Sequence, residues 1–196
     1  MKAKYLIVLG ILAFFVFYGI SVNNSLIEQE ENVNSAWAQV ENQYQRRADL
    51  IPNLVNTVRG AADFESETLQ EVIEARSRAT SINIDANDLS NPQAFQQFQE
   101  AQGQLSGALS RLLVTVERYP ELKANQNFRD LQAQLEGTEN RISTERMRFN
   151  QAAQSYNTRV RRFPASLIAS IAGFEQKQYF QADQGAEEAP TVDFGN

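Results

Sequence analysis

A strict seven-residue repeat of apolar side chains in the second half of the chain constrains the fold more than any other feature. The repeat consists of Phe128, Leu135, Ile142, Phe149, Tyr156 and Phe163. A repeat of this length keeps one face of a helix against a partner helix and imposes a left-handed supercoil on the pair. The sequence therefore predicts a long helix that ends at Pro164 and packs lengthwise against other helices.

Two further stretches space their apolar residues as helices do. One ends at Pro120 and consists of Phe95, Phe98, Leu105, Leu109, Leu112, Val116 and Tyr119. The other runs from Leu26 to about Ile82, and its apolar phase continues across Pro52. Because a proline inside a helix removes one hydrogen bond and kinks the helix, we expect a single first helix of about 85 Å, at 1.5 Å per residue, kinked near Pro52. The predicted fold class is all-α, an elongated antiparallel bundle of three long helices on an N-terminal transmembrane helix.

An uncharged apolar run near the N-terminus occupies residues 5–22. A spanning helix requires about 17 to 25 residues, so the run predicts a retained membrane anchor. A cleaved signal peptide is the alternative, but no small-x-small cleavage pattern follows the run. Lys2 and Lys4 precede the run and acidic residues follow it. The positive-inside rule then predicts a cytoplasmic N-terminus and an extracytoplasmic body.

These features divide the chain into five expected segments. They are a short cytoplasmic N-terminus (1–4), the transmembrane helix (5–22), the helical body (23–164), a short apolar helix or docking segment (165–180) and an acidic tail (181–196). The composition of the tail is typical of disordered chain.

The segment 165–180 contains a weakly apolar patch. Its members are Leu167, Ile168, Ile171 and Phe174. The patch either belongs to a short helix that folds back over the end of the bundle, or it contacts a partner or the membrane, since exposed apolar patches usually mark contacts.

The composition excludes several classes of chemistry. The chain contains no Cys and no His, which rules out disulfides, thiolate zinc sites, Cys nucleophiles and Ser-His-Asp triads. A formal net charge of −6 argues against nucleic acid as a partner. Carboxylates remain for catalysis, but a slim bundle rarely offers the cleft that a catalytic pair requires. We therefore expect no enzymatic activity, no catalytic residue, no bound metal and no cofactor.

One basic residue falls on the apolar face of the first predicted helix. Arg47 lies seven residues after Val40 and seven before Leu54, and a buried charge requires a partner and hydrogen bonds. Glu139 and Glu145 on the last long helix are the candidate partners, and such a pair would fix the register between helices. The alternative is that the guanidinium extends to solvent beside the kink.

The residues around Arg47 are also predicted to serve the structure. Asp49 is a candidate cap for amide groups freed near Pro52. Trp37 is expected to pack as an anchor of the core rather than to form a platform for a ligand. The full set of predicted structural residues is Trp37, Arg46, Arg47, Asp49, Pro52, Asn53, Glu139 and Glu145.

The same part of the chain resembles a known family. Residues 46–55, with the sequence RRADLIPNLV, resemble the signature segment of the LemA family. The resemblance runs from the anchor to about Phe180 and leaves the acidic tail outside. Shorter matching stretches lie at 74–76, 119–124, 135–142, 149–150, 156–157 and 163–164. The resemblance implies a bacterial protein with one N-terminal transmembrane segment, a helical-bundle body and no established enzymatic activity.

Together, these features lead us to expect a membrane-anchored scaffold of the bacterial cell envelope with a periplasmic body. It would act through self-association and protein contacts. The expected partners are the lipid bilayer, further copies of the chain as a homo-oligomer, and a membrane protein. The alternative is an accessory or regulatory subunit of a membrane protease or sensor, held through the patch at 167–174.

Overall fold

The computed structural model describes residues 2–60, 66–86 and 88–181, and the side chains from Lys4 onward. Within these ranges the chain is helical and contains no strand, which confirms the all-α fold class. The helices are α1 (Lys2–Arg59), α2 (Ser66–Ser81), the 3-10 turn η1 (Asp88–Ser90), α3 (Pro92–Val116), α4 (Pro120–Ala124), α5 (Gln126–Arg161) and α6 (Ala165–Ala172).

The first helix differs from its prediction. Pro52 lies inside α1, as expected, but α1 ends at Arg59 and a separate helix begins at Ser66. Gly60 follows the last helical residue of α1, and glycine is a poor helix former because it loses the most backbone freedom on folding. The prediction of one helix as far as Ile82 is therefore wrong. Helices on both sides of a chain reversal bury their apolar faces in the same core. The helical spacing of apolar residues therefore did not reveal where α1 ends.

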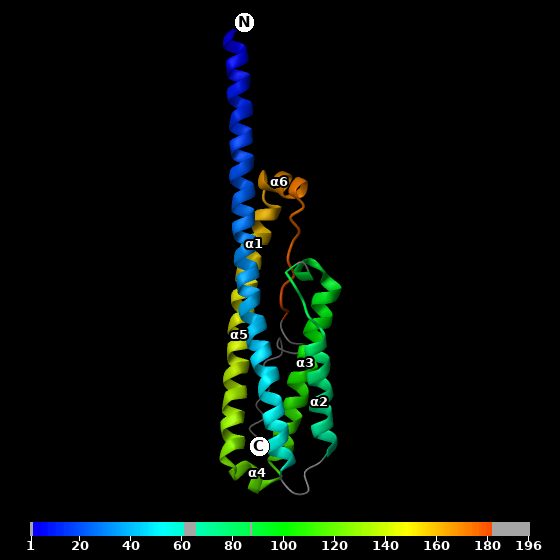
Figure 1. Ribbon diagram of the computed structural model, residues 1–196. Helices are drawn as coiled ribbons and strands as arrows, with labels where there is room; N and C mark the ends of the chain where they lie inside the picture. The colour runs from blue at the N-terminus through cyan, green and yellow to red at the C-terminus, as the bar shows by residue number, and fades with distance from the viewer. Residues whose placement is uncertain (1, 61–65, 87, 182–196) are drawn as a thin grey trace, which may run out of the picture.

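The long helices form two antiparallel pairs. The first pair is α1 with α5, and the second is α2 with α3 (Figure 1). The expectation of three long helices is thus not confirmed, because α2 supplies a fourth within the described residues. Asn91 caps α3, since its Oδ1 accepts hydrogen bonds from the backbone N–H groups of Gln93 and Ala94.

Buried side chains form two clusters along the bundle. The lower core, near α4, includes Ile51, Leu54, Val58, Leu69, Val72, Leu105, Leu112, Leu122, Phe128 and Leu135. The upper core includes Val22, Leu26, Val33, Trp37, Tyr44, Phe95, Phe98, Ile142, Phe149, Tyr156, Ala165, Ala169 and Phe180.

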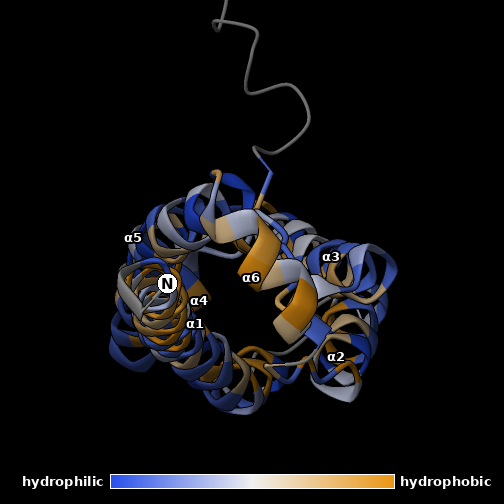
Figure 2. Cartoon of the chain, turned by 90° about the horizontal axis from the view of Figure 1, so that it is seen from above, coloured by the Kyte–Doolittle hydropathy of each residue, from blue (hydrophilic) through white to orange (hydrophobic). Residues whose placement is uncertain are grey.

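The chain after α5 folds back over the bundle. In the view from above, α6 lies across the upper end of the bundle (Figure 2). Gly173 caps its C-terminal end, with a positive φ of 79° that suits a residue without a Cβ atom. Residues 173–181, called here the strap, then run down the bundle without regular secondary structure. The expected helix at 165–180 is thus helical only over Ala165–Ala172, and the acidic tail lies outside the described residues except for Gln181.

The upper part of α1 extends beyond the bundle. Residues 4–17 are all exposed, and Tyr18 is the first residue that other elements partly cover. Within the described residues, α1 is the one helix whose length and apolar composition would allow it to cross a membrane. No break separates this exposed part from the part of α1 that forms the core.

Candidate functional site

Arg47 is the most deeply buried charged residue that the structure describes. It lies on α1 with 1% of its surface exposed. Its Nη1 donates hydrogen bonds to Oε2 of Glu139 on α5 at 2.9 Å and to Oγ of Ser106 on α3 at 2.7 Å. Its Nη2 donates to Oε1 of Gln102 on α3 at 2.6 Å. One guanidinium therefore joins three of the four long helices.

Gln102 extends this network to the fourth long helix. It is 8% exposed, and its Nε2 donates to the carbonyl of Ala79 on α2 at 3.2 Å. The Arg47 guanidinium also lies over the ring of Tyr44, 5.1 Å from its centroid. A buried charge with this many partners fixes the relative positions of the helices that supply them.

The structure distinguishes between the two predicted partners of Arg47. Glu139 forms the ion pair, whereas Glu145 accepts a bond from Arg148 of its own helix at 2.7 Å. Asp49 accepts from Gln45 at 2.9 Å rather than from a backbone amide near the proline. The other predicted residues of this region, Arg46, Pro52 and Asn53, lie exposed on α1.

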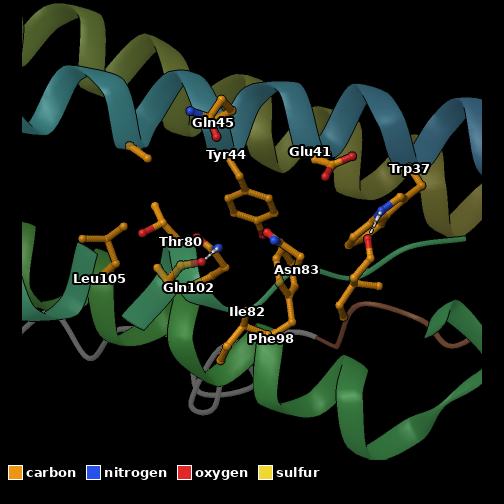
Figure 3. Close-up of a pocket in the computed structure, with 13 residues that line it drawn as sticks. Trp37, Glu41, Tyr44, Gln45, Thr80, Ile82, Asn83, Phe98, Gln102 and Leu105 are labelled. Carbon is orange, nitrogen blue, oxygen red and sulfur yellow. Dashed lines mark hydrogen bonds between the residues drawn. The ribbon is translucent and has the colours of Figure 1, made fainter. Parts of the chain in front are cut away.

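Trp37 is the centre of an aromatic cluster in the upper core. Its Nε1 donates to the carbonyl of Ile84 at 3.2 Å, which attaches the segment after α2 to α1. Figure 3 shows Trp37 and Tyr44 projecting from α1 toward that segment and toward Phe98 of α3. The rings packed around Trp37 within 6 Å are Phe95, Phe98, Phe149 and Phe180.

The pocket beside this cluster is small. It has a volume of about 60 Å³, whereas sites for small-molecule ligands occupy about 300 to 1,000 Å³. Glu41 is the one carboxylate among its lining residues. The pocket therefore has room for a few waters and lacks a second acidic group for acid–base chemistry.

A wider groove of about 500 Å³ lies over the buried arginine. Its polar lining includes Arg47, Gln102, Ser106, Glu139 and Arg146. Glu139 is the one carboxylate among the lining residues, and it forms an ion pair with Arg47. Across the described parts of the chain, no group of three or more acidic residues is placed to hold a metal ion.

The strap is held by two asparagines of α5. Asn157 donates through Nδ2 to the carbonyl of Lys177 at 2.8 Å and accepts through Oδ1 from its N–H at 2.9 Å. Asn150, one heptad earlier, makes the same pair of bonds to Phe180, both at 2.9 Å. Lys177 also forms an ion pair with Glu30 of α1 at 2.8 Å. These contacts seat Phe180 in the aromatic cluster.

Tyr156 lies between the two asparagines on α5 and has an unusual hydroxyl. Its side chain is fully buried, and its hydroxyl oxygen has no hydrogen-bond partner. Burial, followed by the nearby negative charges of Glu30 and Glu175, raises the pKa of this phenol well above its usual range.

The residues predicted to contact a partner divide into two groups. Leu167 and Ile171 are 58% and 88% exposed. Ile168 and Phe174 are half-buried and pack against the upper core. The segment therefore folds over the end of the bundle and still leaves one apolar face uncovered.

No role was predicted for four residues of the polar network and the strap contacts, although two of them, Asn150 and Asn157, lie in the stretches at 149–150 and 156–157 that resemble the LemA family. The four are Gln102, Ser106, Asn150 and Asn157. The signal for Gln102 was its heptad position, seven residues after Phe95 and seven before Leu109. Asn150 and Asn157 each directly follow a residue of the apolar heptad row, but nothing local in the sequence indicates which backbone they bind.

Comparison with known proteins identifies a family and several relatives of the chain. A model of the LemA family matches residues 36–194. Protein LemA of Metamycoplasma hominis is 23% identical over 92% of this chain and 79% of its own length. Magnetosome protein MamQ 2 of Paramagnetospirillum magneticum is 24% identical over 95% of this chain and 75% of its own. Magnetosome protein MamQ of Magnetospirillum gryphiswaldense is 24% identical over 86% and 68%.

The matched range includes the signature segment at 46–55 and continues into the acidic tail as far as residue 194. The expectation that the resemblance ends near Phe180 is therefore wrong. Because the match covers most of the sequence, the chain belongs to the LemA family.

Proposed function

We propose that this LemA family protein is a membrane-anchored scaffold of the bacterial cell envelope, which acts through self-association and protein contacts and has no catalytic activity. The observation that carries the proposal is the continuity of α1. Its 58 residues, about 87 Å at 1.5 Å per residue, lead from an exposed apolar stretch into the core without a break. α1 thus joins the anchor to the body as one continuous helix.

The use of buried polar groups supports a structural role. Arg47, Gln102 and Asn157 are each less than 10% exposed, and each bonds to a neighbouring helix or to the strap. Arg47 and Gln102 line the groove of about 500 Å³, but their Nη and amide groups already bond to neighbouring helices. A catalytic site instead leaves such groups open to substrate. We therefore assign these residues to fixing the shape of the body.

Self-association is assigned to the part of α1 above the bundle. Its apolar side chains at 4–17 are exposed, and a Cβ atom at Gly10 would meet no other atom within 4 Å. Small residues let membrane helices approach closely, and packing in lipid depends on that approach. Gly10 and Ala13 are small residues about one turn apart on this part of α1.

Light scattering coupled to size exclusion in detergent tests self-association. The wild-type chain is expected to form oligomers, and Gly10→Ile is expected to shift them toward monomer. Gly137→Ile is the matched control, because a Cβ atom at Gly137 also meets nothing within 4 Å but the residue lies on α5 of the body. A wild-type monomer over a wide concentration range would contradict the proposal.

We place the N-terminus in the cytoplasm and the body in the periplasm, on the strength of Lys2 and Lys4 ahead of the apolar run. The chain has no cysteine, so a single Val114→Cys, at a side chain 71% exposed on the body, gives a clean probe. A maleimide that cannot cross membranes should label this cysteine in cells whose inner membrane is intact. Labelling only after lysis of that membrane would reverse the orientation.

The second candidate function is an accessory or regulatory subunit of a membrane protease or sensor. The exposed face at Leu167 and Ile171 favours it, because a protein partner is one way to cover such a face. Site-specific photo-crosslinking from position 171 tests it. A single stoichiometric protein adduct would favour the subunit, and adducts to lipid alone would count against it.

A further inference from the structure

The exposed part of α1 is short for a membrane anchor. The hydrocarbon core of a bilayer is about 30 Å thick, and residues 4–17 provide only about 21 Å at 1.5 Å per residue. The uncharged apolar run continues to Val22, which extends it to about 27 Å. A helix that crosses the bilayer therefore places Tyr18, the first partly covered residue, and Val22, the first buried one, near the hydrocarbon boundary.

The element that covers this level of α1 is α6. It packs against both α1 and α5, and its buried Ala165 and Ala169 share the upper core with Val22 and Leu26. Figure 1 shows α6 beside α1 at the upper end of the body, with only α1 continuing above it, and Figure 2 shows it across that end. If Val22 lies at the boundary, α6 lies there too.

The outward side of α6 suits this environment. Leu167 and Ile171, one turn apart, are 58% and 88% exposed, and Phe163 just before the helix is 75% exposed. Residues 163–174 contain no charged side chain. A helix that lies in a membrane interface has an apolar face turned into the acyl boundary in this way.

Basic side chains stand directly before this apolar segment. Arg161 and Arg162 are exposed at the end of α5, and Arg159 is half-buried with its Nε atom unpaired. Guanidinium groups bind phosphate oxygens through two parallel hydrogen bonds. Their place next to the apolar face matches the headgroup layer of an anionic bilayer.

We infer that α6 is an interfacial helix: Phe163, Leu167 and Ile171 insert into the acyl boundary of the bilayer, and Arg161 and Arg162 bind anionic phospholipid headgroups. The inference rests on the proposed anchoring by α1. The body then touches the membrane at two places, the spanning helix and α6, and two contacts fix its tilt where one would leave it free to rotate.

Spin labels on single cysteines test the inference in the full chain, since the natural sequence has none. Ile171→Cys is the probe, Leu12→Cys marks the spanning part of α1, and Val114→Cys marks the aqueous body. Each labelled protein is reconstituted in vesicles of phosphatidylcholine and phosphatidylglycerol. Collisions with oxygen, which concentrates in lipid, are compared with collisions with a water-soluble nickel chelate. The label at 171 is expected to favour oxygen several-fold, as the label at 12 does, while the label at 114 favours nickel.

The outcomes separate the two proposals. Oxygen preference at 12 with nickel preference at 171 would overturn the interfacial helix and leave the anchor standing. Protection of 171 from both reagents would assign the face to a protein and also overturn the inference. Nickel preference at 12 would overturn the anchor itself, and the interfacial helix with it.

The arginines provide a second, independent readout. With Ile171→Cys as the background, Arg161→Gln with Arg162→Gln is compared in vesicles with and without phosphatidylglycerol. Oxygen preference at 171 is expected to rise with the anionic lipid in the parent and to lose that dependence in the double variant. Arg129→Gln with Arg141→Gln, two exposed arginines elsewhere on α5, is the charge-matched control. Equal lipid dependence in both double variants would contradict the headgroup contact.

Discussion

The guanidinium of Arg47 in α1 lies 2.9 Å from Oε2 of Glu139 in α5, and the two side chains differ sharply in exposure, at 2% and 52%. The arginine is thus inside the bundle, and its charge partner reaches in from the surface. Loss of the carboxylate leaves Arg47 with its neutral acceptors, Gln102 and Ser106. Loss of the arginine leaves the buried Gln102 and the half-buried Ser106 without their donor and also opens a cavity.

This asymmetry predicts unequal costs for removing each partner. Arg47→Ala is expected to lower the free energy of unfolding by about 3 to 5 kcal/mol, through the cavity and the unpaired groups. Glu139→Gln is expected to cost about 1 kcal/mol, because the amide still accepts a hydrogen bond and the site is half-exposed. Chemical denaturation in detergent measures both. Glu145→Gln is the control, with a cost of about 0.5 kcal/mol or less for an ion pair within one helix. Equal losses for Arg47→Ala and Glu145→Gln would contradict the assignment.

Phe180 is predicted to protect the chain's one tryptophan from water. Its ring stacks on Trp37, with centroids 5.9 Å apart. Phe180→Ala is expected to cost about 3 to 5 kcal/mol and to shift the emission of Trp37 to longer wavelength. Tyr179→Ala, at a side chain 41% exposed, should leave the emission unchanged. An unshifted spectrum for Phe180→Ala would show that the strap does not occupy the aromatic cluster in solution.

The two asparagines of α5 are predicted to hold the strap by its backbone. Asn157→Asp keeps the acceptor for the N–H of Lys177 and loses the donor to its carbonyl. We expect a cost of about 1 to 3 kcal/mol and faster hydrogen exchange at the amides of Lys177 and Phe180. Gln154→Glu introduces the same charge at an exposed position of α5 and should change neither quantity. Unchanged exchange in Asn157→Asp would refute the role of the asparagine.

The buried phenol of Tyr156 predicts a loss of stability at alkaline pH. The fold raises the pKa of Tyr156, so the folded state retains a proton that the unfolded state releases above its ordinary pKa of about 10. This contribution to stability is full below pH of about 10 and falls as the pH rises toward the folded pKa. Because the hydroxyl has no partner, Tyr156→Phe should cost little at pH 7 and should move alkaline unfolding to higher pH. Tyr179→Phe is the control, and an identical alkaline transition in wild type and Tyr156→Phe would contradict the prediction.

Much of this architecture follows from spacing alone. The heptads located α5, and the placement of Arg47 between Val40 and Leu54 indicated a charge on the core face. The spacing of apolar residues did not reveal that α1 ends before Gly60. A second helix that packs back against the core buries its apolar residues with the same spacing as a continuation of the first. The result was one helix predicted where α1 and α2 stand.

The strap and the polar network were harder to predict for a different reason. Asn157 bonds to a backbone 20 residues away and Arg47 to an amide 55 residues away. Such pairings depend on which helices become neighbours, and the pattern within one helix does not specify this. Extended chain without a sheet partner also leaves no period-two pattern to recognise.

The distance between the anchor and the body tests the central claim that α1 joins them as one rod. Spin labels at Leu12→Cys and Asn42→Cys lie on exposed positions of α1, about 45 Å apart along a continuous helix at 1.5 Å per residue. Pulsed electron resonance on the full chain in lipid nanodiscs measures this distance. We predict a single narrow distribution centred near that value. A broad distribution, or one centred well below it, would show a hinge between anchor and body and would contradict the account.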